Sequence, residues 1–481
     1  MPVLFDDAKQ FDLTVPVVIV GGGACGLVAA LSAKDAGAEV LVLERDRAPS
    51  GSTALSSGFI PAAYTRFQRA AGVTDSPETL AADVMRKNHG EADPRIVEAI
   101  SRASGRAIEW LAERCGIEFV LVEGFLYPGH SALRMHAVPE KTGRALMAAL
   151  TAACGRAGID ILCEAQVTAL HADADRRVRG VSFARRGQAT EEAGCEALIL
   201  ACSGFGGDAD MVKRHIPELA GVDFFGHVGN RGDAVIWGEA LGAAVADMTA
   251  YQGHGSVATP HGILITWALM MEGGIQVNAN GERFSNEHGG YSEQCVSVLA
   301  QPGRVAWNIY DQRLHRLGLE FPDYRDAVAA GAIRTAPDLE SLAALAGMPA
   351  QALKKTVAQA TDFAAGRSAD PFGRDFTGKP PLAPPYYLVK VTGSLFHTQG
   401  GLVVDEEARV CDREGRPLPN LFAGGGAARG ISGAHVWGYL SGNGLLSAVS
   451  LGWIAGQAAA VQAISHPARS RSRPSPESPH G

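Results

Sequence analysis

Residues 17–44 constrain this chain more than any other stretch, because an apolar β-branched run, a glycine turn, an Ala-rich helical segment and a second apolar run follow one another there. Gly21, Gly23 and Gly26 form G-x-G-x-x-G, in which glycines allow a tight turn, close approach to a pyrophosphate and close helix–strand packing. Glu44 follows Gly26 by eighteen residues, near the spacing of about 20 at which an acid binds a ribose diol. The order predicts a dinucleotide-binding unit, and a glycine-rich turn in another α/β unit is the alternative.

The composition bounds the classes of protein to which the chain can belong. Its 481 residues are 46% hydrophobic and 20% charged, enough for a large core of two or three domains. The net charge of −8 does not suggest a nucleic-acid partner. The 8 cysteines include no C-x-x-C pair, so we expect no metal, haem or iron–sulfur module and a cytoplasmic setting. Without a signal pattern or a run of eighteen apolar residues, we expect no membrane span.

A change in residue composition and in the pattern of predicted elements divides the chain. Residues 254–384 mix short strands, helices and proline-rich loops, whereas the flanking segments alternate apolar runs with glycine turns and helices. We therefore expect an α/β fold, in which a Rossmann-like dinucleotide-binding domain is interrupted by an inserted α+β capping domain. The expected boundaries are 1–253 for the first part of the binding domain, 254–384 for the cap, 385–465 for the second part and 466–481 for a disordered tail.

Periodicity and composition predict further local elements. The hydroxyl-rich residues 45–58 suit contacts to the second half of a dinucleotide, and a flexible loop is the alternative. Asp233 begins a predicted helix and is either its N-cap or a cofactor contact. The expected helices are 77–116, 145–158, 234–242, 339–365 and 442–456, and the expected strands are 159–167, 179–184, 197–201, 274–278 and 387–391.

Several motifs occur together in an order that is similar to one family of flavoproteins. They are GGGACG (21–26), GSTALSSG (51–58), ACSGFGG (201–207), GDA (232–234), GERFSNE (281–287), HTQGG (397–401) and GGG (424–426). From about residue 15 to residue 456, the chain resembles the flavoproteins that include fumarate reductases, succinate dehydrogenase flavoprotein subunits and 3-ketosteroid dehydrogenases. The resemblance implies FAD, a split FAD domain, a cap over the isoalloxazine, and chemistry at a carbon–carbon bond.

The resemblance also implies how FAD is held. Attachment is expected to be non-covalent, because the loop that carries the flavin-linking histidine of succinate dehydrogenases here reads GSTALSSG. Gly426 stands where the fumarate reductases place a glutamate. The residues expected to bind FAD are Gly21, Gly23, Ala24, Cys25, Gly26, Glu44, Arg45, Ser52, Thr53, Ser57, Gly58, Val167, Ser203, Gly204, Asp233, Gly425, Gly426, Leu445 and Leu446.

The chain departs from the fumarate reductases at the residues that deliver a proton. Tyr291 stands at the position of their proton-donating arginine, Trp267 at that of the delivery acid, and Met270 at that of a second relay arginine. Protonating a carbanion requires an acid with a proton supply. Because Trp267 and Met270 provide none, fumarate reduction is not expected.

Two tyrosines resemble the ketosteroid dehydrogenase pattern instead. By this resemblance Tyr291 takes the α-proton of a ketone, and Tyr439 hydrogen-bonds the ketone oxygen together with backbone N–H groups near Gly442. Because an unperturbed tyrosine has a pKa of about 10, a neighbour must lower it or proton loss must be concerted. His288, Tyr127 and His136 are the candidates for that neighbour.

Other residues suit a carboxylate. His397, His254 and Thr266 align with residues that bind substrate carboxylates in the fumarate reductases. Arg134 lies in a loop that matches a substrate-side region, where either carboxylate pairing or, preferably, a solvated loop charge is expected. Two tyrosines combined with carboxylate-binding residues resemble the 4-oxocyclohexanecarboxylate dehydrogenases.

The expected function is FAD-dependent introduction of a C=C bond next to the ketone of a small cyclic keto acid, with Tyr291 and Tyr439 catalytic. The alternatives are a 3-ketosteroid dehydrogenase, a reductase of an unsaturated carboxylate, and a flavin-binding protein without catalysis. The electron acceptor stays open between oxygen, a quinone and a separate carrier.

Overall fold

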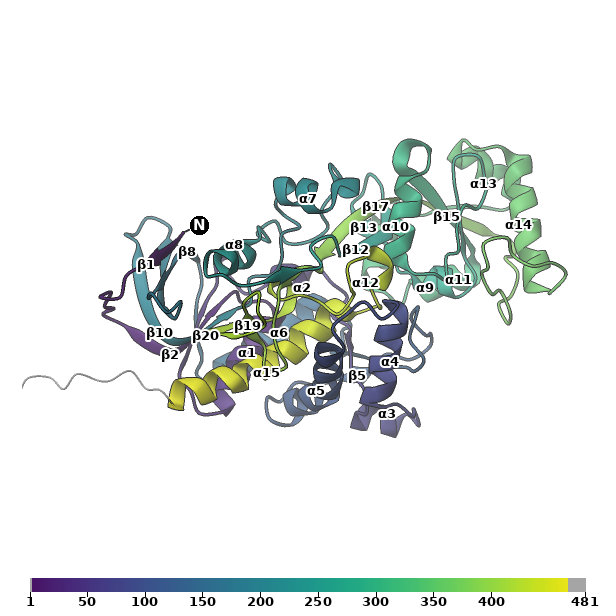
Figure 1. Cartoon of the computed structure of the whole chain (residues 1–481). Coiled ribbons are helices and arrows are strands. Elements are labelled where there is room, and N and C mark those ends of the chain that lie inside the picture. The colour runs from purple at the N-terminus through teal and green to yellow at the C-terminus, as the bar shows by residue number, and fades with distance from the viewer. Residues whose placement is uncertain (1, 466–481) are drawn as a thin grey trace, which may run out of the picture.

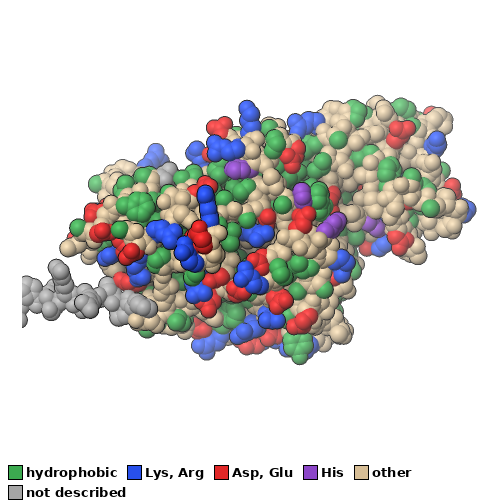
Figure 2. Space-filling model, in the orientation of Figure 1, with side chains coloured by type: hydrophobic (Ala, Val, Ile, Leu, Met, Phe, Trp, Pro, Cys, Tyr) green, Lys and Arg blue, Asp and Glu red, His purple; other side chains and the backbone are tan. Residues whose placement is uncertain are grey.

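The computed structural model describes residues 2–465, and the tail predicted over 466–481 lies outside this range. A nine-stranded sheet and a six-stranded sheet organise the chain. Figure 1 shows α15 (Asn443–Ser465) at the same end of the molecule as the larger sheet, and α14 (Ala350–Ala364) at the opposite end. Acidic and basic side chains are interspersed over the face drawn in Figure 2.

The larger sheet has parallel strands at its centre. β2 (Thr14–Val20) pairs in parallel with β3 (Val40–Leu43) on one side and with β10 (Glu191–Leu200) on the other. The inner residues of these strands are buried, as the uninterrupted apolar runs require. The remaining strands are β1 (Val3–Phe5), β7 (Asp160–Leu162), β8 (Ala165–Ala172), β9 (Val178–Arg185), β19 (Arg409–Cys411) and β20 (Pro417–Ala423).

Two helices pack closely on this sheet. α1 (Ala24–Asp35) lies against α15 through small residues: a Cβ at Gly452 would come within 2.6 Å of the carbonyl oxygen of Cys25, and one at Gly456 within 2.3 Å of that of Ala29. α15 is long and apolar enough to cross a membrane, with a window hydropathy of 1.5, but 67% of that window is buried within the protein. Burial against α1 accounts for this apolar composition.

The inserted sheet begins before and ends after the expected boundaries of the cap. β12 (Tyr251–Ala258) pairs antiparallel with β17 (Tyr386–Thr398), so the segments that enter and leave the insertion both belong to its sheet. The strand order is β13-β12-β17-β15-β14, with β16 also on β17. The other strands are β13 (Ile263–Leu264), β14 (Ile275–Val277), β15 (Val305–Asp311) and β16 (Arg334–Ala336).

Two long predicted helices are each divided. The segment 77–116 forms α4 (Pro77–Lys87) and α5 (Pro94–Glu113), and 339–365 forms α13 (Leu339–Ala346) and α14. Proline at the first turn of α5 and the left-handed Gly347 after α13 explain the interruptions. The other helices are α2 (Gly51–Ala54), α3 (Arg66–Ala70), α6 (Gly143–Arg156), α7 (Ala209–His215), α8 (Asp233–Ala240), α9 (Ala268–Met271), α10 (Tyr291–Leu299), α11 (Gln312–Gly318) and α12 (Pro322–Ala329). Three small strands, β4 (Ile60–Pro61), β5 (Val120–Leu121) and β6 (Met135–Ala137), pair beside them, and β11 (Val245–Ala246) pairs with β18 (Gly401–Leu402).

Candidate active site

The turn between β2 and α1 accepts only glycines at two positions. Gly21 has a φ of +106°, and a Cβ on Gly26 would lie 1.9 Å from the Gly21 carbonyl oxygen. The buried Glu44 carboxylate holds the turn, accepting from the N–H of Gly22 at 2.7 Å through one oxygen and from that of Asp46 at 2.9 Å through the other. These contacts fix the turn that leads into α1, and a helix N-terminus favours a pyrophosphate.

An elongated cavity leads from this turn to the inserted sheet. Its two parts share six lining residues: Ser52, Thr53, Ser203, Gly425, Gly426 and Ala448. A dinucleotide is an elongated molecule, so the continuous cavity and the glycine cradle fit FAD. The predicted FAD residues that line the cavity are Gly21, Gly23, Ala24, Cys25, Glu44, Arg45, Ser52, Thr53, Ser57, Gly58, Val167, Ser203, Asp233, Gly425, Gly426 and Leu445.

Three predicted FAD residues do not line the cavity and act in packing. Gly26 lies against Gly21 as described. A Cβ on Gly204 would come within 2.1 Å of Thr398 Oγ1, which joins the binding domain to the end of β17. Leu446 is fully buried in the core of the larger domain. Packing by these three residues shapes the cavity that their motif neighbours line.

Three residues of the segment 227–230, His227, Gly229 and Asn230, line the cavity and were not predicted. Its residues hydrogen-bond to two predicted cofactor residues: Arg45 Nη1 donates to the Gly229 carbonyl at 3.0 Å, and the N–H of His227 donates to Ser52 Oγ at 3.0 Å. His227 Nε2 also lies 2.7 Å from Asp46 Oδ2. No motif marks this loop in the sequence, because tertiary contacts alone bring it to the end of β3.

Two local expectations in the binding domain are corrected. The loop alternative for 45–58 is partly wrong, since residues 51–54 form α2 and the N–H of Ala24 donates to Thr53 Oγ1 at 3.3 Å. The N-cap of α8 is Gly232, in the left-handed conformation with φ 77°, and not Asp233. Asp233 instead faces the cavity, where burial raises the pKa of its carboxyl.

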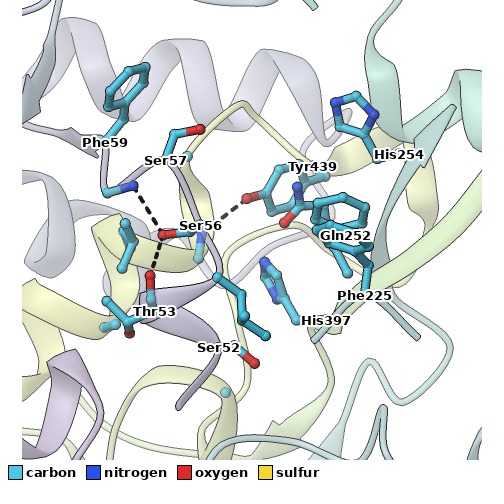
Figure 3. Close-up of a pocket in the computed structure, with 18 of the residues that line it drawn as sticks. Ser52, Thr53, Ser56, Ser57, Phe59, Phe225, Gln252, His254, His397 and Tyr439 are labelled. Atoms are coloured by element: carbon cyan, nitrogen blue, oxygen red, sulfur yellow. Dashed lines mark hydrogen bonds between the residues drawn. The ribbon is translucent and has the colours of Figure 1, made fainter. Parts of the chain in front are cut away.

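Tyr291 and Tyr439 come together where the cavity meets the cap. Tyr291 is the first residue of α10, and Tyr439 follows a short 3₁₀ helix, Val436–Gly438. Their ring centroids are 6.1 Å apart, and both rings line the cavity. Figure 3 shows Tyr439 on the same side of this cavity as His397, with Ser56 and Thr53 of the binding domain nearby. The two predicted catalytic residues therefore share one site.

Burial raises the pKa of Tyr291 to about 12, against hydrogen bonding from Ser441, Gly442 and Tyr439 that lowers it. In the sequence, Ser441 and Gly442 come shortly after Tyr439, in the run YLSGNG (439–444). Of the three predicted neighbours, Tyr127 lines the same cavity as Tyr291 and packs against the same cluster.

The histidine candidates for that role are occupied elsewhere. His288 Nε2 lies 3.3 Å from the Met270 carbonyl oxygen. His136 contacts Thr65 Oγ1 at 2.7 Å and the Arg134 carbonyl oxygen at 2.9 Å. Neither ring is positioned to ionise Tyr291.

Tyr439 keeps its proton more firmly than Tyr291. Burial, with the nearby Tyr291 as a further cause, raises the pKa of Tyr439 well above its ordinary value, and its oxygen accepts from the N–H of Gly444 at 3.3 Å. A protonated phenol can donate to a substrate oxygen, so the pair divides into a candidate base and a candidate hydrogen-bond donor.

His397 is a neutral donor. Two contacts meet at His397 Nδ1: Gln399 Nε2, which can only donate, lies 2.8 Å away, and the Thr398 carbonyl oxygen, which can only accept, lies 3.3 Å away. The shorter contact favours a ring proton on Nε2. Burial lowers the pKa of His397 to about 4. A Cβ on Gly444 would come within 2.6 Å of Nε2, so the glycine leaves that side of the ring accessible.

His254 and Thr266 line the same cavity. The His254 ring stacks on Tyr291 with centroids 4.7 Å apart, and its Nδ1 accepts from the N–H of Ser256 at 3.1 Å. Burial lowers the pKa of His254 to about 3, so this ring is also neutral near pH 7. Thr266 Oγ1 accepts from the N–H of Ala268 at 3.3 Å, which leaves its hydroxyl proton available.

Arg134 is neither a solvated loop charge nor a substrate ligand. It is 1% exposed, and its guanidinium is bidentate to Asp75, at 2.9 and 2.8 Å, and also pairs with Asp83. Both of these carboxylates are buried. The expectation of solvation is wrong because two acids from the segment preceding and within α4 enclose the guanidinium.

The substrate end of the cavity carries little charge. Trp267 lines it and donates through Nε1 to the Glu287 carbonyl at 3.2 Å, whereas Met270 is buried in the cap core. Within the described range, no Lys or Arg lines this part of the cavity, and Asp323 is its one carboxylate. Nor do residues 2–465 contain a group of three His, Cys, Asp or Glu that could hold a metal ion.

A cavity for an extended dinucleotide, closed by an inserted sheet that carries polar side chains, defines a flavin-dependent oxidoreductase of the FAD type. The chain belongs to the FAD binding domain family, whose model matches residues 16–445. It is therefore an FAD-dependent oxidoreductase, and its α/β fold with an FAD-binding domain is confirmed.

Curated relatives of the chain include both a reductase and a dehydrogenase. The chain is 29% identical over 452 residues, 93% of this chain and 77% of the relative, to fumarate reductase (cytochrome) of Shewanella frigidimarina. It is 26% identical over 556 residues, 94% of each, to 4-oxocyclohexanecarboxylate 2-dehydrogenase of Sinomonas cyclohexanicum.

Similar solved structures also include both a reductase and a dehydrogenase. The chain is similar to an open flavocytochrome c3 fumarate reductase, with a TM-score of 0.79, 28% identity and coverage of 95% of this chain and 79% of that one. It is also similar to 3-ketosteroid-Δ4-(5α)-dehydrogenase from Rhodococcus jostii RHA1, with a TM-score of 0.76, 27% identity and coverage of 95% and 99%.

Proposed function

We propose that the protein is an FAD-dependent dehydrogenase that introduces a C=C bond next to a ring ketone. The observation that carries this proposal is the pair Tyr291 and Tyr439, with ring centroids 6.1 Å apart in the cavity that continues to the FAD cradle. One phenol is the more acidic and serves as the base, and the other stays protonated to bind the ketone oxygen.

The residues divide the reaction as follows. The ionised oxygen of Tyr291 takes the α-proton, which the adjacent ketone makes acidic. The hydroxyl of Tyr439 donates to the ketone oxygen as negative charge develops there. FAD held by Gly23, Ser52 and Thr53 would supply a hydride acceptor for the β-hydrogen, so one proton and one hydride would leave as the double bond forms. Oxygen, a quinone or a separate carrier then removes the electrons from the protein.

Reduction of a fumarate-like acid is disfavoured despite the identity to fumarate reductases. Such an acid carries two carboxylates, which proteins bind with arginines or other cations. No Lys or Arg of the described range lines the substrate end of the cavity, and His254 and His397 are neutral. Trp267, at the position expected for the delivery acid, has no proton to relay.

The residues that line the substrate end of the cavity also help to choose between a cyclic keto acid and a 3-ketosteroid as substrate. The relative named 4-oxocyclohexanecarboxylate 2-dehydrogenase supports a keto acid, for which His397 and Thr266 would provide neutral donors. The absence of a lining cation, the presence of Asp323 and the apolar Phe59, Leu264 and Phe321 favour an uncharged ring ketone of the 3-ketosteroid type.

The test is anaerobic addition of each substrate to the oxidised holoprotein. We expect a 3-ketosteroid to bleach the flavin absorbance and 4-oxocyclohexanecarboxylate to bleach it more slowly, because its carboxylate has no cation to meet. Fumarate should not reoxidise the reduced holoprotein. Failure of both ring ketones to bleach the flavin, together with rapid reoxidation by fumarate, would contradict the proposal.

The pH dependence of flavin reduction is a second expected result. Because the base acts only when ionised and the pKa of Tyr291 is about 12, the rate should rise with pH through the range 7 to 10. Well below the pKa the ionised fraction increases about tenfold per pH unit. His254 and His397, with pKa values of about 3 and 4, do not titrate in that range. Stopped-flow traces at saturating ketone measure this slope, and a plateau beginning near pH 7 would argue for another base.

A further inference from the structure

The end of α4 contacts the turn from which one of the two candidate catalytic tyrosines projects. Lys87, the last residue of α4, donates through Nζ to the Gly289 carbonyl oxygen at 2.9 Å and forms an ion pair with Glu293. These partners lie two residues before and two residues after Tyr291. Lys87 therefore holds the turn at which α10 begins, and Tyr291 is the first residue of that helix.

The next residue of the chain contacts the segment that leads to the other tyrosine. Asn88, which is fully buried, donates through Nδ2 to the Ile431 carbonyl oxygen at 3.1 Å. A Cβ on Gly438, the residue before Tyr439, would come within 3.1 Å of Asn88 Cβ. Consecutive residues at the end of α4 therefore contact the two segments that carry the catalytic pair.

The body of α10 is held within the inserted sheet. Ser292 Oγ accepts from the N–H of Gly253 at 2.9 Å, and Gln294 Nε2 donates to Gln276 Oε1 at 2.7 Å. Gly253 belongs to β12 and Gln276 to β14. The helix therefore moves with the cap, and only its first turn is held by a side chain of α4.

Lys87 and Glu293 link the cap to the FAD-binding domain through a largely buried contact. Their side chains are 13% and 27% exposed, and in the part of the chain that the structure describes they form the one ion pair between the cap and the rest. The Lys87 stem passes beside Gly129, where a Cβ would lie 3.6 Å from Lys87 Cδ. Gly290, with a φ of +140°, makes room for the acid, since a Cβ on it would come within 2.4 Å of Glu293 Oε2. A pair with this little solvent around it is screened less than a surface pair.

We propose that Lys87 is a positioning residue for Tyr291: by holding both sides of the turn that begins α10, it sets the place of the Tyr291 ring relative to Tyr439. This inference rests on the proposed roles of the two tyrosines, but it does not depend on which ring ketone is the substrate. The ring centroids are 6.1 Å apart, and one ring belongs to the cap while the other belongs to the FAD-binding domain. A displacement of about 1 Å can cost about 100-fold in rate, so a residue that does not line the cavity can still control the reaction.

Two double variants distinguish this role from simple packing. Lys87→Met with Glu293→Gln, the neutral pair, removes both charges, so that neither is left buried without a partner. Lys87→Glu with Glu293→Lys, the reversed pair, restores the attraction with the charges exchanged. Arg86→Met is the matched control, because Arg86 is the preceding cation of α4 and its contacts, with Asp83 and the Gly129 carbonyl, stay within the FAD-binding domain.

The first readout is the rate of flavin reduction at saturating ring ketone. We expect the neutral pair to lower this rate about tenfold with unchanged FAD content, and the reversed pair to restore it to within about threefold of the parent. Arg86→Met should leave the rate unchanged. A merely structural ion pair predicts instead a lower melting temperature of the neutral pair with the parent rate. That result, an equal loss of rate in the neutral and reversed pairs, or a loss as large in Arg86→Met, would overturn the inference.

The second readout needs no substrate. A 3-fluorotyrosine placed at position 291 of the FAD-loaded protein reports the surroundings of that ring through its fluorine resonance, and the same label at Tyr310, in the cap core, is the reference. We expect the neutral pair to shift or broaden the resonance at position 291 and to leave the reference unchanged. An unchanged resonance at position 291 would refute the role of Lys87. A change there, in a protein whose flavin no ring ketone reduces, would leave the placement of the ring by Lys87 standing and refute the proposed function.

Discussion

Tyr291→Phe is expected to abolish flavin reduction by a ring ketone while FAD remains bound. Phenylalanine preserves the ring that stacks on His254, with centroids 4.7 Å apart, and removes the oxygen that would take the α-proton. General-base catalysis contributes about 10²–10⁴-fold, so the rate of anaerobic bleaching should fall by at least about 10³-fold. Stopped-flow absorbance measures the rate, and the flavin spectrum after gel filtration measures FAD content.

The control for this substitution is another buried tyrosine of the cap. Tyr310 lies in the cap core, donates to or accepts from the Tyr324 hydroxyl at 2.8 Å, and does not line the cavity. Tyr310→Phe should cost about 1 kcal/mol of stability and leave bleaching unchanged. Full bleaching by the Tyr291 variant would assign proton abstraction to another group.

Gly26→Ala is expected to prevent FAD binding. The added Cβ would meet the Gly21 carbonyl oxygen at 1.9 Å, and the strand and helix on either side are buried, so the clash is relieved only if the turn moves. Movement of that turn displaces the N-terminus of α1 from the pyrophosphate position. Purified protein should be colourless or lose its yellow colour on gel filtration, and added FAD should not restore the flavin absorbance.

A second helical glycine provides the matched control. Gly155 lies in α6, is exposed, and has no atom within 4 Å of the Cβ position. Gly155→Ala should therefore stabilise the protein by about 0.5–1 kcal/mol, the usual gain of alanine over glycine in a helix. Normal FAD content in the Gly26 variant would show that the turn tolerates a side chain and would remove the packing argument.

The predictions that survive the structure are those set by local chemistry. The G-x-G-x-x-G turn, the flanking strands and the glycine turn near Gly425 require particular backbone conformations, which short stretches specify. The interrupted helices show the limit of that reasoning. Apolar spacing alone did not reveal that α5 starts anew at Pro94 or that Gly347 ends α13.

Charge states required the tertiary structure. Arg134 was expected to be solvated, yet Asp75 and Asp83 enclose it. His254 and His397 are predicted to suit a carboxylate, and burial lowers the pKa of both, so near pH 7 they could bind one only as neutral donors. Solvation depends on every neighbour of a group, and residues that are distant in sequence supply most of those neighbours.

The sequence by itself determined the dinucleotide cradle, because residues 17–44 contain the strand, turn, helix and acid in one continuous segment. Only the tertiary structure decided the chemistry at the other end of the cavity. Tyr291 begins one helix of the cap and Tyr439 lies in a loop of the binding domain, so their separation depends on how the inserted sheet packs. The contact from Lys87 to Gly289 has the same origin, since hydrogen bonds between distant segments exist only after the chain has folded.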